Sequence, residues 1–422
     1  MLQSSPPRLW WLAAFAAAVV ATATAQGDLR DVVTLKTGKT VTGRVVAPFA
    51  PGPLLVVQGG KRVRIERADV AEMDLLASRI AEFLRQRKKL AGKSAAQAIL
   101  IEWADAHGLP NLAQLHAMHV CLASEDEHAH HRLGHRQRGG QWLWPHGERW
   151  LSAAQLEQAL SQDPITLSGE RFRLRLDGNL RAGVAALFDL ERLGVFWRDA
   201  FGEALQLDEV LQPIDVNVTY AVADFAKWGY RPLPYYVPAP HGDVARTFFA
   251  SPAQARPQRL FFVGTQALLY RTLIGQSNAR DDRDRTCAWL EIGLPMFAEL
   301  TMQGDAGFAE PGEVRTQDLH AAQTMTRELD LARLLHQPMY GGYYLLDDAP
   351  TQTLWSTAAM FTQFLLREDN LPDTRVRFLA YVRSALGDKR GDSSTLFDKD
   401  MGKRIEEFEA PFRAWLQKVA AR

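Results

Sequence analysis

The sequence predicts an α+β protein, and two patterns of hydrophobic residues carry this prediction. Over residues 28–74, and again after residue 164, apolar and polar residues alternate in short stretches, as in β-strands with one buried face. Over residues 74–163, and over most of the chain after residue 258, apolar residues recur every three or four positions, as on the buried face of a helix. We therefore expect a small amino-terminal β module, a helical linker, a mixed β-sheet and then an all-helical half.

Residues 1–25 have the features of a secretory signal peptide. Arg8 precedes the apolar stretch LWWLAAFAAAVVA, and Ala23-Thr24-Ala25 forms a small-x-small cleavage site. The apolar stretch is short for a membrane span, and no later segment is long and apolar enough to be one. We predict cleavage after Ala25 and a periplasmic or secreted mature protein without a transmembrane span. A retained anchor helix is the alternative.

Residues 26–74 are predicted to form the β module, with four or five strands in an SH3-like arrangement. The strand patterns DVVTLKTGKTVTGRVV, LLVVQ and KRVRIE are separated by turn signals at Pro51-Gly52-Pro53 and Gly59-Gly60. The segment carries no cluster of acidic, His or Ser residues. Packing or contact is therefore its expected role.

Residues 75–162 are predicted to form the helical linker. The stretch LASRIAEFLRQRKKLAG places Leu76, Ile80, Phe83 and Leu84 on one helix face, and two further helical stretches follow. The paired helices resemble a tetratricopeptide-like hairpin, but no repeat of fixed period indicates a long solenoid. A Trp-rich segment after the helices, with a Gly-Gly pair and a Pro-His-Gly turn, predicts a short β-hairpin.

Residues 163–422 are predicted to form one large domain. Strand patterns come first, and helices are expected over residues 258–274, 285–301, 353–385 and 398–419. The formal net charge of the chain is zero, which argues against nucleic acid as a partner. The two cysteines, Cys121 and Cys287, are too few for a disulfide scaffold. We expect two buried free thiols, with a bridge between them as the alternative.

Two stretches of this domain are similar to the active-site helices of gluzincin zinc metallopeptidases: LFFVGTQALLY at residues 260–270 and AWLEIGLPMF at residues 288–297. In that family the first helix carries H-E-x-x-H, whose His residues at i and i+4 share a helix face and bind zinc. The intervening Glu is the general base. A Glu before a Gly in the second helix is the third ligand. The order of strands and helices after residue 163 extends the resemblance over the whole domain, and the complete chain resembles multidomain proteins of the cell envelope.

The resemblance implies that the zinc ligands and the base have been lost. The two His positions are Phe262 and Gln266, the base position is Val263 and the third-ligand position is Ile292. Catalytic zinc needs about three protein ligands with N, S or O donors, so we predict no metal cofactor and no hydrolysis here. Apolar side chains are expected to fill the vacated space.

A cleft of the peptidase type would be lined by Tyr270, Glu291 and Tyr343. Glu291 stands one residue before the third-ligand position. One residue turns a side chain by about 100° around a helix, so Glu291 is expected to point away from where the metal would be.

A His-rich stretch, EDEHAHHRLGH, is an alternative metal site. His131 and His135 have i, i+4 spacing and His128 lies one turn earlier, so a continuous helix would place three imidazoles on one face. Arg132 stands where a catalytic Glu would be, and Gly134 weakens the helix. Surface histidines without a metal are the simpler interpretation. His116 and His119 are expected to be half-buried and hydrogen-bonded.

These patterns together predict a catalytically inactive metallopeptidase-like protein of the cell envelope. Its expected partner is a peptide, a protein or an envelope polymer that is bound without cleavage. Two alternatives stay open: a hydrolase with a non-standard site near His131 and His135, and a purely structural envelope protein with a filled cleft.

Overall fold

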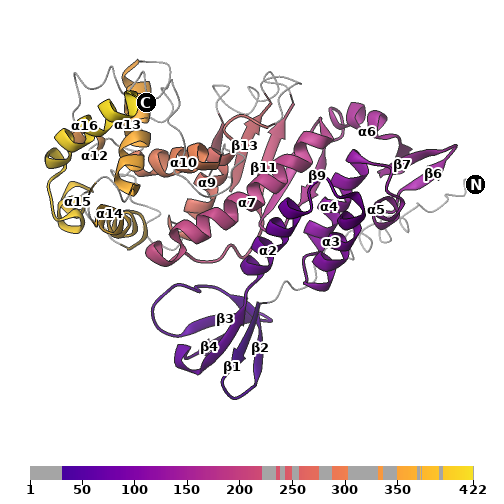
Figure 1. The fold of residues 1–422 in the computed structure, drawn as a ribbon, viewed down its shortest axis with the longest axis horizontal. Coiled ribbons are helices and arrows are strands. Elements are labelled where there is room, and N and C mark those ends of the chain that lie inside the picture. The colour runs from indigo at the N-terminus through magenta and orange to yellow at the C-terminus, as the bar shows by residue number, and fades with distance from the viewer. Residues whose placement is uncertain are drawn as a thin grey trace, which may run out of the picture.

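The computed structural model describes residues 31–220, 234–237, 243–249, 256–274, 288–302, 331–335, 349–367, 371, 373–388 and 393–421. The predicted signal peptide, Cys287 and Tyr343 lie outside these residues. The described chain is α+β, as predicted: an antiparallel sheet, a group of helices, a mixed sheet and an all-helical part follow one another (Figure 1).

The amino-terminal sheet consists of five antiparallel strands in the order β4-β3-β2-β1-β5. The strands are β1 (Asp31–Leu35), β2 (Thr40–Val45), β3 (Leu54–Gln58), β4 (Lys61–Ile65) and β5 (Val70–Asp74), with a short 3₁₀ turn, η1 (Arg67–Asp69), before β5. Their inward-facing residues form a small core separate from the main one. The buried Asp31 carboxylate accepts the backbone N–H groups of Val45 and Leu76, each at 2.7 Å, and so joins the sheet to the first helix.

The helices that follow are α2 (Leu76–Lys89), α3 (Ser94–Ala106), α4 (Pro110–Ala123) and the short α5 (Glu127–Arg132). A three-stranded sheet comes next, with β6 (Arg136–Arg138), β7 (Gln141–His146) and β8 (Arg149–Leu151), and then α6 (Ala153–Leu160). Trp142 and Trp144 of β7 are buried against the helices. The start of α6 is fixed by a capping box between Ser152 and Gln155.

The mixed sheet has the order β12-β13-β11-β10-β9. Its strands are β9 (Ile165–Ser168), β10 (Phe172–Leu176), β11 (Ile214–Thr219), β12 (Tyr235–Val237) and β13 (Val244–Phe248). The inner strands β10, β11 and β13 are parallel, and both outer strands are antiparallel to their neighbours. The crossover from β10 to β11 contains α7 (Leu180–Leu205), which lies along the sheet (Figure 1).

The helical part comprises α9 (Leu260–Thr272), α10 (Ala288–Met302), α12 (Leu331–Leu335), α13 (Ala349–Leu366), α14 (Thr374–Arg383), a π-helical turn η3 (Ser384–Asp388), α15 (Ser393–Met401), a 3₁₀ turn η4 (Ile405–Phe408) and α16 (Glu409–Ala420). Two predicted helices are interrupted. The stretch 353–385 ends one helix at Leu366 and begins another at Thr374, next to Asp373 with a φ of 58°. The stretch 398–419 breaks at Gly402, whose φ of 67° is left-handed.

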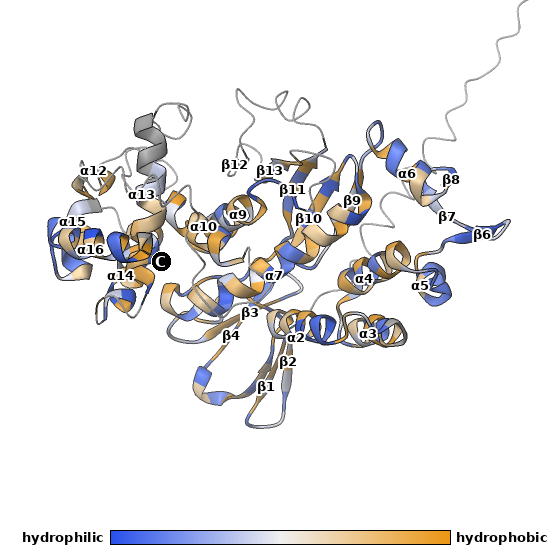
Figure 2. Cartoon of the chain, turned by 45° about the horizontal axis from the view of Figure 1, so that its top comes forward, coloured by the Kyte–Doolittle hydropathy of each residue, from blue (hydrophilic) through white to orange (hydrophobic). Residues whose placement is uncertain are grey.

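One continuous core joins the linker helices, the mixed sheet and the carboxy-terminal helices. Figure 2 shows that α9 and α10, which contribute to this core, are mostly hydrophobic, whereas β6 is hydrophilic. No helix among the described residues has both the length and the apolar character needed to cross a membrane.

Candidate functional site

Helix α9 is buried on every side over residues 260–269. One face packs against α7 with little space, since a Cβ on Gly264 would lie 2.7 and 2.8 Å from Leu193 and Leu190. Strands β12 and β13 and helix α10 also contact α9. A helix that is apolar all round is a core helix, and this one carries the first of the two predicted peptidase stretches.

All four predicted ligand and base positions are inside the core. Relative exposure is 1% for Phe262, 0% for Val263, 5% for Gln266 and 4% for Ile292. The Phe262 ring stacks on Trp355 of α13, with 5.4 Å between ring centroids. The Arg259 guanidinium lies 5.6 Å from both ring centroids. The four side chains are therefore packed among other residues of the described core.

Two hydrogen bonds show how α9 and α10 are aligned. The Phe262 backbone N–H donates to the Glu299 carboxylate at 2.8 Å, and the Tyr270 hydroxyl donates to Glu291 at 2.6 Å. The helices are thus antiparallel, and the two contacts are separated by eight residues, or about 12 Å of α-helical rise. Phe262 is at the Glu299 end, while Ile292, next to Glu291, is at the Tyr270 end. The described contacts therefore divide the predicted positions between two neighbourhoods.

Tyr270 and Glu291, two of the residues predicted to line the cleft, form a hydrogen-bonded pair. Glu291 is buried, and burial raises its pKa to about 7, while the hydrogen bond from Tyr270 acts in the opposite direction. Tyr270 is partly exposed, and its ring lies 5.5 Å from that of Tyr236. The pair offers a buried acid and a phenol but no set of metal ligands.

The predicted helical face of three histidines is not formed. Helix α5 ends at Arg132, and Gly134 adopts a left-handed φ of 69°. The Gly134 N–H then donates to the His131 carbonyl at 2.9 Å, and the His135 N–H donates to the His130 carbonyl at 3.0 Å. These two bonds make a Schellman motif, in which the second residue after the helix cap folds back over the last helical turn.

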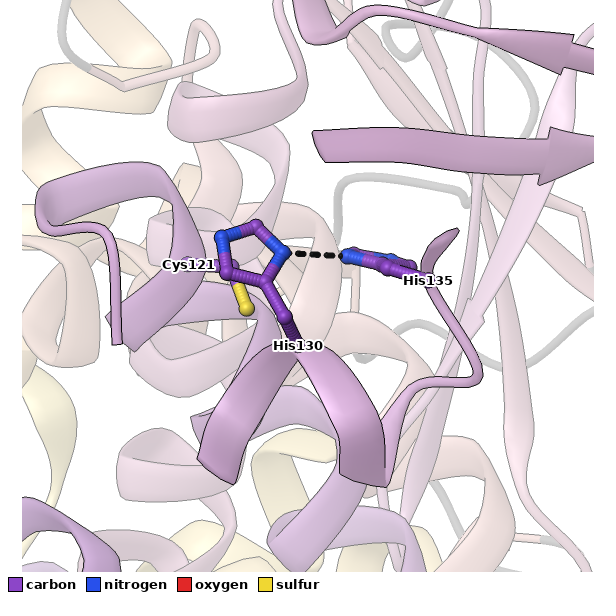
Figure 3. A group of neighbouring side chains, drawn as sticks. All are labelled: Cys121, His130 and His135. Atoms are coloured by element: carbon purple, nitrogen blue, oxygen red, sulfur yellow. Dashed lines mark hydrogen bonds between the residues drawn. The ribbon is translucent and has the colours of Figure 1, made fainter. Parts of the chain in front are cut away.

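This turn places His135 on His130 and not beside His131. The two Nδ1 atoms are 2.7 Å apart, and Figure 3 shows one nitrogen of each ring pointing at the other ring, with the Cys121 sulfur next to His130. One ligand atom from each of these three residues lies within 4.8 Å of the others. His128 and His131 are exposed and are not members of this group, and His131 pairs with Glu127 at 3.3 Å.

Three elements supply the group. Cys121 is in the last turn of α4, His130 is in α5, and His135 precedes β6. The position of α4 is fixed at its other end by Glu170, which accepts the N–H groups of Asn111 and Leu112 at 3.0 and 3.1 Å. A carboxylate at the start of a helix satisfies donors that have no partner within the helix.

Aromatic rings of β7 hold the two imidazoles. His130 stacks on Trp142 with 4.4 Å between centroids and 3° between planes, and His135 lies 4.0 Å from Trp144. Burial lowers the pKa of both histidines, that of His135 to about 4, and raises the pKa of the Cys121 thiol to about 12. At neutral pH the group therefore consists of a thiol and two neutral imidazoles.

Sequence reasoning missed Cys121 and His130 as partners of His135. The sequence signal for this contact is Gly134. We expected this glycine to weaken a helix that continues to His135, but it terminates the helix. A Gly just after a helix cap predicts that the next residue contacts the last turn of the helix. In the stretch HHRLGH the next residue is His135, and the residue that it contacts in the last turn is His130.

The sequence was also compared with known proteins. No protein-family model matches the chain, and no curated protein matches it.

Proposed function

We propose that this chain is a catalytically inactive, metallopeptidase-like protein of the cell envelope that acts by binding a peptide, a protein or an envelope polymer. One observation carries the proposal: the positions that correspond to zinc ligands and general base are Phe262, Val263, Gln266 and Ile292, and all are buried in the α9–α10 core. Phe, Val and Ile have no donor atom for zinc. The signal-peptide-like segment supports secretion to the periplasm or beyond.

Denatured casein and soluble peptidoglycan fragments are suitable probes, because one is an unfolded polypeptide and the other an envelope polymer. The full mature chain should bind at least one of them, measured by fluorescence anisotropy with labelled probe. Chelator should leave the affinity unchanged. Mass spectrometry of the recovered probe should show no cleavage products.

Tyr270→Phe is the variant that tests the predicted cleft, since it removes the hydrogen bond to the buried Glu291. We expect weaker binding of the probe. Val376→Ala, at an exposed residue of α14, is the matched control and should bind like the wild-type chain. Cleavage that chelator abolishes would contradict the proposal and favour a hydrolase.

A purely structural role is the second candidate. It is favoured by the complete burial of residues 260–269 of α9. Failure to bind either probe, in a chain whose circular dichroism is that of a folded protein, would favour this candidate over the first.

A further inference from the structure

We infer that Cys121, His130 and His135 form a binding site for one transition-metal ion of the zinc class. The three ligand atoms lie within 4.8 Å of one another. Zinc binds Cys sulfur at about 2.3 Å and His nitrogen at about 2.0–2.1 Å, so a sulfur and a nitrogen on opposite sides of one ion are at most about 4.4 Å apart. A small adjustment, in which the Cys121 sulfur approaches the imidazoles and the two Nδ1 atoms separate slightly from 2.7 Å, lets all three residues contact a single ion.

The donor set selects the kind of ion. A thiolate and two imidazoles are soft to borderline ligands, which suit Zn²⁺, Co²⁺ and copper and do not suit Mg²⁺ or Ca²⁺. Three protein ligands leave a fourth position for water. Glu125 and Asp126 are close enough to act electrostatically on both Cys121 and His130, and their charge favours a cation.

The ring positions are set by the fold before any ion binds. The Schellman turn fixes His135 over His130, and Trp142 and Trp144 hold the two ring planes. Ligands whose rotamers are locked by packing lose little conformational entropy on binding. Cys121 is partly exposed, which gives the ion a path to the site.

The ring nitrogens of His130 and His135 are the atoms of the two imidazoles that would bind an ion. The Nδ1 atoms face each other and share one proton in a hydrogen bond, while His130 Nε2 is buried without a hydrogen-bond partner among the described residues. Two nitrogens that contact an ion must both present a lone pair, so the shared proton moves to an Nε2 atom. The Cys121 thiol loses its proton to solvent, and the overall exchange is one ion bound for one proton released.

The test uses the full mature chain without a polyhistidine tag, stripped with chelator and then titrated with Co²⁺. We expect one ion per chain and a near-ultraviolet absorption band from thiolate-to-cobalt charge transfer. Zn²⁺ should displace the cobalt and remove the band. Competition with a chromophoric chelator gives the Zn²⁺ affinity.

Cys121→Ser should abolish the thiolate band. His135→Gln removes a ligand itself, so it should weaken Zn²⁺ binding more than 10- to 100-fold, which is the usual effect of removing a residue that only hydrogen-bonds to a ligand. His131→Gln is the control, because this exposed side chain is on the same helix and outside the group. Circular dichroism and thermal unfolding of each variant show that it is folded.

Equal Zn²⁺ affinity in the wild-type and Cys121→Ser chains, or cobalt bound without a thiolate band, means an adventitious ion only and overturns the inference. Casein and peptidoglycan binding measured on Cys121→Ser is independent of this result, because the site is distant in sequence from α9 and α10. Failure of the metal site and failure of the proposed function are therefore separate outcomes.

Discussion

His116 is an ionisable side chain that the fold accepts only without its charge. The residue is 0% exposed in α4, and neither ring nitrogen has a hydrogen-bond partner among the described residues. The prediction of a half-buried, hydrogen-bonded His116 was therefore wrong. Its ring packs edge-on against Phe83 and Phe188. Burial, together with the positive charge of Arg87, lowers its pKa to about 3.

This shift predicts acid sensitivity. The folded-state pKa lies below the usual 6.5, so the unfolded chain binds the proton more tightly and stability is lost as pH falls from about 6.5 towards 3. Between pH 7 and pH 5 His116 should lower the free energy of unfolding by about 2 kcal/mol. Urea denaturation of the wild-type chain and of His116→Phe at both values measures the loss. The variant should lose less stability than the wild type by about this amount.

His128→Gln is the matched control, since His128 is exposed. It should keep the pH dependence of the wild-type chain. If His116→Phe and the wild type lose the same stability between the two pH values, the buried imidazole does not set the acid limit.

At the scale of single elements, the sequence of α10 has a packing explanation at one of its glycines. At Gly293, α10 lies close against α13: a Cβ there would lie 2.8 Å from the Ala358 carbonyl oxygen and would overlap the Thr362 hydroxyl. The Gly that follows the third-ligand position in the resemblance is thus required by a helix–helix contact, independently of any metal.

Gly293→Ala should force α10 and α13 apart. We expect the free energy of unfolding to fall by about 1–3 kcal/mol, the usual cost of overpacking, as measured by urea denaturation. The double variant Gly293→Ala, Thr362→Ala removes one of the two obstructing groups and should recover part of the loss. A Gly293→Ala chain with wild-type stability would show that the two helices can separate without cost.

The sequence predicted these elements better than their ends. The period of the apolar residues predicted helices over 258–274 and 285–301, and the structure has α9 and α10 there. It did not predict the break between Leu366 and Thr374, although the polar stretch REDNLPD with Pro372 lies there in the sequence, and it did not predict the break at Gly402. At Gly402, a positive φ at a single residue ends α15 without changing the hydrophobic period.

The same limitation explains the metal-ligand group. His130 and His135 come together through the left-handed φ of Gly134, and Cys121 joins them from another helix. Local spacing predicted a helical i, i+4 pair of His131 and His135, whereas the structure brings together residues five apart around a turn. Contacts of this kind depend on the turn and on tertiary packing, neither of which the hydrophobic period records.

At the scale of the whole molecule, the β module has its own core and is held to the rest by a few contacts. Glu209 N–H donates to the Val46 carbonyl, and Arg44 donates to the Val210 carbonyl, both at 2.7 Å. Phe49 packs directly on Gly202 of α7, where a Cβ would lie 2.6 Å from the ring.

Phe49→Ala should loosen this attachment. We expect amides of β1–β5 to exchange with deuterium faster, while those of α9 and α10 are unchanged, and overall stability to fall by about 1–3 kcal/mol because the ring is only partly buried. Met73→Ala, at an exposed side chain of β5, should leave exchange unchanged. Uniformly faster exchange in the Phe49→Ala chain would show that the module and the main core open together.

The order and pairing of strands in the two sheets could not be predicted from the sequence pattern. Alternation of polar and apolar residues predicted strands, and the mixed sheet was confirmed. However, the pairing of β1 with β5 and the parallel order of β10, β11 and β13 join segments far apart in the chain. Strand neighbours of this kind are selected by burial of the whole core.

The long helix α7 determines how cooperatively the molecule unfolds. Its 26 residues extend about 39 Å, and along that length it meets α2 and α4 of the linker, β9 and β10 of the sheet, and α9, α10 and α14 of the carboxy-terminal part. Local unfolding of any one of these neighbours exposes part of α7 to solvent and so destabilises the packing of the others. The linker helices and the carboxy-terminal half should consequently unfold in a single thermal transition, and a protease that cleaves α7 should leave two fragments that do not stay folded.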